Sequence, residues 1–128
     1  MDKTVFVVQP DLPLSSIQTG ILADQWLAPA TTRYNVPVCI RIDGALELDA
    51  LRLALQSMVD RHEILRTVYR HEAGGIFQAI APKIAVPFEL LDVSSPAEVT
   101  ECLARLAAHA FDLSREPPVR GRTHERRV

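Results

Sequence analysis

The stretch 61–69 reads RHEILRTVY, and it marks the point where one type of secondary structure is expected to give way to another. Ahead of it, apolar residues recur at helical spacing from position 51 onward, which predicts a helix over about 49–62. Its last three residues, Thr67, Val68 and Tyr69, are of types that favour strands. The stretch therefore predicts a helix that hands over directly to a strand.

Two further strands are predicted on either side of this stretch. The sequence AGG at 73–75 supplies a turn, and the apolar run IFQAI at 76–80 is expected to return as a hairpin partner. Residues 34–43 alternate between apolar and other side chains, which predicts a strand with one buried face. Pro37 cannot donate to a ladder, so it places that end of the strand at an edge or a bulge.

Two more helices are indicated by their capping residues. Ser15 and Gln18 have the spacing of a capping box, and Pro29 is expected to end the helix near residue 28. Ser95 and Glu98 form a second such pair ahead of a third helix. Helices and hairpins thus alternate along the chain, and at least three strands are predicted. The predicted class is α+β, an α/β sandwich in which helices pack on one face of a mixed or antiparallel sheet.

The composition is that of a soluble globular domain or part of one. The chain has 128 residues, of which 48% are apolar and 23% charged, so there is enough apolar material for a core. A net charge of −2 gives no electrostatic reason to expect nucleic acid or a membrane as a partner. The apolar run near the N-terminus is too short for a signal peptide or a bilayer span. We therefore expect a cytoplasmic protein in which Cys39 and Cys102 are reduced thiols.

Few residue patterns in the chain suggest chemistry. Its four histidines belong to no HExxH pair and have no cysteine or histidine at metal-ligand spacing, so no metal site is expected. Neither GxSxG nor a glycine-rich phosphate loop occurs. The cluster at 61–63 remains, together with Arg66. Taken on its residues alone, it is a helix C-terminus whose cations lie favourably on the helix dipole.

In company with other segments, however, RHEILRTVY resembles the second core motif, RHExLRTxF, of the condensation domains of nonribosomal peptide synthetases. Ser15 and Gln18 lie at positions of the family's first motif, which runs Ser-x-Ala-Gln. The resemblance covers roughly residues 9–122 and rests on five segments in the family's order: LSSIQ at 14–18, YNVP at 34–37, DGALELDAL at 43–51, RHEILRTVY at 61–69, and FDLSREPPVRGR at 111–122.

This resemblance implies a fold like that of chloramphenicol acetyltransferase, with two lobes and a tunnel between them. It implies amide formation between acyl and amine groups that carrier proteins hold as thioesters on phosphopantetheine arms. The family's catalytic motif is HHxxxDG, whose aspartate is held by an arginine. By this match, Arg66 is the candidate for the active-site partner and Arg61 for fold integrity, with His62 and Glu63 as further support of the site.

The chain also departs from the family pattern. Four motif positions differ from the usual residue: Ile17 replaces alanine, Gly20 replaces arginine, Leu22 replaces tryptophan and Tyr69 replaces phenylalanine. Such differences are expected of a subtype. HHxxxDG does not occur, and residues 123–128 read THERRV where an apolar strand would follow. We therefore expect 1–122 to be the N-terminal part of a condensation domain and 123–128 to be an aberrant or disordered tail, as in a truncated or frame-shifted product.

The expected function is that of a condensation-domain fragment that is inactive by itself, with no catalytic residue, metal or cofactor of its own. Two alternatives stay open: a non-catalytic module that docks carrier proteins, and a fragment of another acyltransferase of the superfamily. The expected partners are carrier proteins and adjacent synthetase domains. An incomplete sheet would also leave an open edge and an uncovered apolar face, so self-association is expected.

Overall fold

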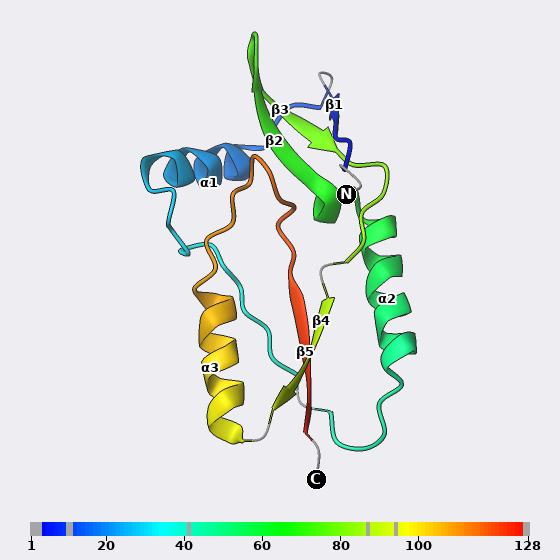
Figure 1. Ribbon diagram of the computed structural model, residues 1–128. Helices are drawn as coiled ribbons and strands as arrows, with labels where there is room; N and C mark the ends of the chain where they lie inside the picture. Colours follow the sequence, from blue (N-terminus) through cyan, green and yellow to red (C-terminus); the bar gives the residue numbers. More distant parts are fainter. Residues whose placement is uncertain (1–3, 10–11, 41, 87, 94, 127–128) are drawn as a thin grey trace.

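The computed structural model describes residues 4–9, 12–40, 42–86, 88–93 and 95–126 (Figure 1). In chain order the elements are β1 (Val7–Gln9), α1 (Ser16–Leu27), α2 (Leu48–Arg61), the 3-10 turn η1 (Glu63–Arg66), β2 (Thr67–Glu72), β3 (Gly75–Ile80), β4 (Phe88–Val93), α3 (Pro96–Ala107) and β5 (Gly121–Arg126).

The α+β class is confirmed, and the strands of the described residues form two separate sheets. One is antiparallel, with the order β1-β3-β2, and the other is a parallel pair of β4 and β5. The expected mixture of strand directions is therefore present, but it is divided between two sheets and does not occur within one. In Figure 1 the antiparallel sheet lies at one end, next to α1, and the parallel pair runs between α2 and α3.

The predicted helix-to-strand handover and hairpin are confirmed. α2 ends at Arg61, η1 makes the corner, and β2 pairs with β3 from Thr67 opposite Ile80 to Glu72 opposite Gly75. Gly74 and Gly75 have φ angles of +109° and +143°, which glycine adopts without the strain a Cβ would bring. At the base of the hairpin Thr67, Val68 and Tyr69 are all buried, so both faces of β2 are covered there.

The predicted helix starts are confirmed by their caps. At α1 the Ser15 side chain accepts from the Gln18 N–H and the Gln18 side chain accepts from the Ser15 N–H, so both halves of the capping box form. α1 ends at Leu27, with Ala28 as its C-cap. At α3 the Ser95 hydroxyl accepts from the Glu98 N–H. These polar side chains satisfy backbone donors that a helix start would otherwise leave without partners.

The predicted strand at 34–43 is wrong. The described residues of this segment are extended but belong to no strand, and Val36, Val38 and Ile40 are 84%, 76% and 77% exposed. The alternation is real, but a strand also needs a neighbour that hydrogen-bonds to it. Within the described part of the chain no strand pairs with this segment. It runs as an extended connection from α1 to α2 (Figure 1).

Three strands were not predicted. β1 has only three residues. β4 and β5 pair directly with each other, although α3 separates them in the sequence. The expectation of a disordered tail is wrong for 123–126, which lie in β5 opposite 90–93 of β4. Pairing with β4 satisfies the backbone of this segment whatever its side chains are, so polar composition alone does not exclude a strand. Residues 127 and 128 lie outside the described residues.

The apolar core is centred between α2, η1 and the segment that follows β3. Val59, Ala81 and Ile84 form a buried cluster, against which Phe6, Leu65, Val86 and Val119 pack. This core holds the end of α2 against the base of the hairpin, and so it positions the stretch 61–69. In the part of the chain that the structure describes, no helix has both the length and the apolar content needed to cross a bilayer.

Candidate functional site

The candidate site is built on the corner between α2 and β2. The backbone N–H of His62 donates to the carbonyl of Met58 at 3.0 Å, which closes the last turn of α2. The Leu65 N–H then donates to the His62 carbonyl, and the Thr67 hydroxyl donates to the Glu63 carbonyl at 2.7 Å. These three bonds fix a tight turn, and the turn directs Arg66 inward, whereas residues 61–64 are exposed.

Arg66 is the anchored member of the cluster. Its side chain is 12% exposed, and Nη1 donates to the Ala81 carbonyl at 2.5 Å. The Ala81 N–H donates back to the Arg66 carbonyl at 3.0 Å. Nη2 lies 3.4 Å from Oε1 of Glu63, a long and partly exposed ion pair. Arg66 and Ala81 therefore hold each other across the base of the hairpin.

One N–H of the Arg66 guanidinium donates no hydrogen bond to the described residues. Its Nε is buried and has no hydrogen-bond partner among the described residues. A cavity of about 250 Å³ lies against this side chain, and Glu63, Ile80 and Pro82 line it with residues from β1 and the segment after it. A buried guanidinium N–H without a partner carries a desolvation cost, which a carboxylate would remove by a charge-assisted hydrogen bond.

Of the other members of the predicted cluster, Glu63 reaches this point, whereas Arg61 and His62 do not. Arg61 is exposed in the last turn of α2, and its side chain makes no hydrogen bond or ion pair within the described part of the chain. His62 is the exposed C-cap residue, and the side chain of Glu63 is 63% exposed although it pairs with Nη2 of Arg66. The cluster at 61–66 is thus one buried arginine with exposed neighbours. A role for Arg61 in fold integrity stays a prediction.

The first-motif residues meet the second motif through one hydrogen bond. Nε2 of Gln18 donates to the Tyr69 hydroxyl at 3.1 Å, while Oε1 of the same side chain accepts from the Ser15 N–H at 2.7 Å. Because a backbone N–H can only donate, the Ser15 contact fixes the orientation of the Gln18 amide. Gln18 thereby caps α1 and joins it to β2, a link that sequence spacing did not indicate.

Burial raises the pKa of the Tyr69 hydroxyl, and its hydrogen bond with Gln18 offsets part of that rise. A tyrosine whose pKa is higher in the folded state stabilises the fold fully below its unfolded pKa of about 10, and this contribution is lost as pH rises through the folded pKa. We expect Tyr69→Phe to lose about 0.5–1.5 kcal/mol near neutral pH, where it lacks the hydrogen bond.

Urea unfolding of both proteins across the alkaline range measures this effect. The unfolding free energy of the original chain should fall more steeply above pH 10 than that of the Tyr69→Phe variant. Parallel curves for the two proteins would show that Tyr69 does not contribute to the alkaline loss of stability.

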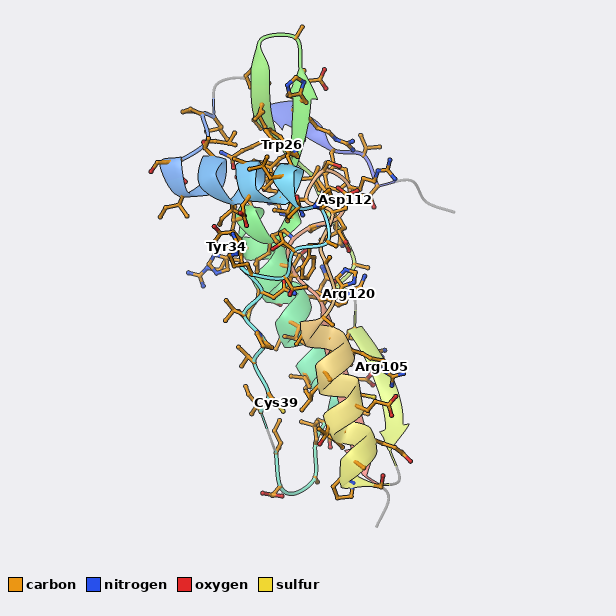
Figure 2. All side chains as sticks on the ribbon, turned by 90° about the vertical axis from the view of Figure 1, so that its left-hand side faces the viewer. Trp26, Tyr34, Cys39, Arg105, Asp112 and Arg120 are labelled. Atoms are coloured by element: carbon orange, nitrogen blue, oxygen red, sulfur yellow. The ribbon has the colours of Figure 1, made fainter. Side chains whose placement is uncertain are left out.

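A larger, open cavity of about 960 Å³ lies beside Tyr69. Its walls come from α1, the extended segment at 34–39, α3, and residues 111–120. Figure 2 shows Cys39 on the extended segment and Arg105 on α3. The lining is mainly apolar, with Leu22 and Leu103 on two of the helices. Such a surface suits an apolar occupant or further protein elements.

A polar network after α3 was also missed from the sequence. Nδ2 of Asn35 donates to the carbonyls of Ala107 and His109 at 2.9 and 2.7 Å, tying the start of the extended segment to the end of α3. Nε2 of His109 lies 3.1 Å from Oε1 of Glu116, and Nη2 of Arg120 lies 3.4 Å from Oε2 of Glu116. The only available signal was the position of Asn35 in YNVP. These contacts support the wall of the larger cavity.

At the turn of that network, Asp112 is held in its ionised form. The Ser114 hydroxyl and backbone N–H both donate to its carboxylate, and with Arg115 and Arg70 nearby they lower the pKa of Asp112. Asp112 and Arg120 lie above the end of α3 in Figure 2. Among the described residues no group of three or more histidine, cysteine, aspartate or glutamate side chains is placed to hold a metal ion.

Comparison with known proteins shows the family to which the chain belongs. Residues 8–127 match the sequence profile of the family described as Condensation domain. The nonribosomal peptide synthetase CymA of Salinispora arenicola is 38% identical over 109 residues, which are 85% of this chain and 1% of CymA. The chondramide synthase of Chondromyces crocatus is 37% identical over 115 residues, which are 85% of this chain and 3% of that synthase.

Solved structures show the same fold. The condensation domain from the monacolin K polyketide synthase MokA superposes with a TM-score of 0.80 at 22% identity, over 94% of this chain and 28% of that one. A four-domain nonribosomal peptide synthetase bound to AMP and glycine superposes with a TM-score of 0.78 at 22% identity, over 98% of this chain and 10% of that one. The chain therefore spans a small part of each protein that it matches.

Proposed function

The chain belongs to the condensation domain family, and from this membership we propose that it supplies the N-terminal part of the condensation domain of a nonribosomal peptide synthetase. The observation that carries the proposal is the position of Arg66. It is the buried arginine of the second motif, anchored on Ala81, with a buried Nε that has no partner among the described residues. This is the geometry expected of an arginine that holds a carboxylate from another segment.

In the parent enzyme the proposed reaction joins two carrier-bound substrates. The amine of the acceptor attacks the thioester carbonyl of the donor, so a C–N bond forms, a C–S bond breaks, and the donor's phosphopantetheine thiol leaves. The histidine of HHxxxDG would position or deprotonate the amine. Arg66 would hold the aspartate of that motif and so fix the loop that carries the histidine. Its role is to position another group and not to touch the substrate.

The sequence of this chain contains no HHxxxDG, so we propose that it does not catalyse the reaction by itself. Its own partners would be the remaining part of the condensation domain, the adjacent synthetase domains and their carrier proteins, in the cytoplasm. Phosphopantetheine belongs to the carriers as part of the substrate, and the chain is proposed to hold no cofactor. Residues 1–122 would hold the motifs of the family segment, and the profile match extends through residues 123–127 although their composition is polar.

The DNA that follows the codon for residue 128 tests the proposal directly. We expect a reading frame, in phase or shifted, that encodes HHxxxDG within the next few tens of residues. A downstream sequence that encodes a different superfamily motif would contradict the peptide-synthetase assignment. Downstream sequence with no acyltransferase motif in any frame would contradict the proposal that the chain is part of a larger catalytic domain.

A further inference from the structure

The guanidinium of Arg66 has two sides, and the two are used differently. Nη1, on one side, donates to the Ala81 carbonyl. Nε and Nη2 form the other side, where two N–H groups point in parallel and match the two oxygens of a carboxylate. There Nε has no partner among the described residues, and Nη2 meets Oε1 of Glu63 at 3.4 Å. That contact is well beyond the roughly 2.7–2.9 Å of a charge-assisted hydrogen bond.

The Nε donor is shielded in this arrangement. It shows almost no surface to solvent, although a cavity of about 250 Å³ lies against the Arg66 side chain. A carboxylate from another segment can therefore reach Nε only after a neighbouring side chain moves. Glu63 lines the same cavity and lies on the same side of the guanidinium, so it is the neighbour whose position controls access.

The side chain of Glu63 can move while its backbone stays in place. The carbonyl of Glu63 accepts from the Thr67 hydroxyl at 2.7 Å, which holds the main chain of the turn. The side chain, in contrast, is 63% exposed, and within the described chain its one polar contact is the one with Arg66. Water and salt screen an exposed ion pair of this kind, so it is weak. Turning the carboxylate toward solvent therefore costs little.

Building on the function proposed above, we propose that Glu63 is an internal competitor for the carboxylate that Arg66 receives. In the chain by itself, Glu63 occupies Nη2 and closes off Nε. When the aspartate carboxylate of the remaining part of the domain arrives, the Glu63 side chain turns out to solvent. Nε and Nη2 then both donate to the incoming group. The exchange breaks one long ion pair and forms two charge-assisted hydrogen bonds, and no proton is transferred.

Electrostatics favours exchange over the binding of a second carboxylate beside the first. If Glu63 kept its place, two negative groups would share one side of a single guanidinium, and their repulsion would oppose binding. After exchange, one positive charge again faces one negative charge. Glu63 therefore lowers the affinity of Arg66 for carboxylates in general. The site then favours an acid that can bond to both donors over one that bonds only to Nη2.

Titration with acetate tests this competition, because acetate carries the carboxylate of an aspartate side chain. Sodium acetate is added to the ¹⁵N-labelled chain while sodium chloride is reduced to keep the ionic strength constant. The Nε–Hε cross-peak of Arg66 in a ¹⁵N–¹H spectrum reports binding at the donor itself. It should move downfield and saturate as the N–H gains a charged acceptor. Glu63→Ala should lower the acetate dissociation constant by about two- to fivefold, the effect of removing an exposed ion pair.

Glu72→Ala is the matched control. It removes the same charge from an exposed residue at the end of β2, next to the hairpin turn and outside the walls of the cavity. The acetate dissociation constant of this variant should equal that of the original chain. Circular dichroism of both variants shows that the fold is retained, so that a changed affinity can be assigned to position 63.

Two results would overturn the proposal, and they differ in what they say of the proposed function. If acetate moved the Arg66 cross-peak with the same dissociation constant in all three proteins, Glu63 would not compete, but Arg66 would still be a receptor for a carboxylate. If acetate moved the cross-peak in none of them, even without the Glu63 side chain, the carboxylate-holding role of Arg66 would be wrong as well.

Discussion

Incubated with two carrier proteins loaded with aminoacyl thioesters, the 128-residue chain is expected to release amide product no faster than the carriers alone. The sequence contains no HHxxxDG, so the histidine that would assist the amine is missing. A positioned acid–base group contributes about 10²–10⁴-fold to such reactions.

Mass spectrometry of the carrier-bound products measures this rate. An intact condensation domain with the same carriers is the positive control and shows that the thioesters are competent. The loaded carriers incubated without the chain are the negative control and set the background rate. Amide formation well above the carrier background by the original chain would contradict the proposed inactivity.

Arg66→Met is expected to destabilise the fold by about 1–3 kcal/mol, the cost of leaving a buried polar group without its partner. The guanidinium of Arg66 is the side-chain donor to the carbonyl of Ala81, which is fully buried, and methionine fills similar space without donating. The midpoint of thermal unfolding should fall by several degrees. The lost hydrogen bond, and not lost volume, is the expected cause.

Arg61→Met provides the matched control. The same substitution is made five residues earlier, at an exposed side chain that makes no hydrogen bond or ion pair within the described chain. Its effect should stay within about 0.5 kcal/mol. Denaturant midpoints of the two variants, each compared with the original chain, measure the two losses of stability. If both variants lost the same stability, the distinction between an anchored Arg66 and a peripheral Arg61 would be wrong.

Elements whose ends depend on local residues, such as helix caps and tight turns, could be predicted from the sequence. The capping pairs at Ser15 and Ser95 fixed two helix starts, and the turn at 73–75 fixed the hairpin. Segments that depend on a distant partner could not be predicted in this way. Residues 34–43 have strand periodicity, but their described residues pair with no strand of the described chain. In contrast, β5 pairs with β4 despite its polar composition. Pairing decides both cases, and pairing is a property of the fold.

In the candidate site, too, some features could be predicted from local sequence and others depend on distant segments. The family motif identified Arg66, but its anchoring on Ala81 depends on how the chain returns from β3. No spacing rule links Gln18 to Tyr69, which are separated by 51 positions. The contacts of Asn35 with the end of α3 likewise appear only once the extended segment is placed. Motifs therefore identified the residues, and tertiary packing determined what each one touches.

The Gln18–Tyr69 hydrogen bond has a consequence for how the family motif can vary. The second motif usually ends in phenylalanine, and this chain has a tyrosine there, 8% exposed. A new buried hydroxyl normally carries a penalty, but Gln18 is already oriented by its capping contact and offers it a donor. Exchange of Tyr69 for phenylalanine in this chain is therefore expected to change its stability by about the contribution of one hydrogen bond. Gln18 of the first motif thus allows tyrosine in place of phenylalanine at the last position of the second motif.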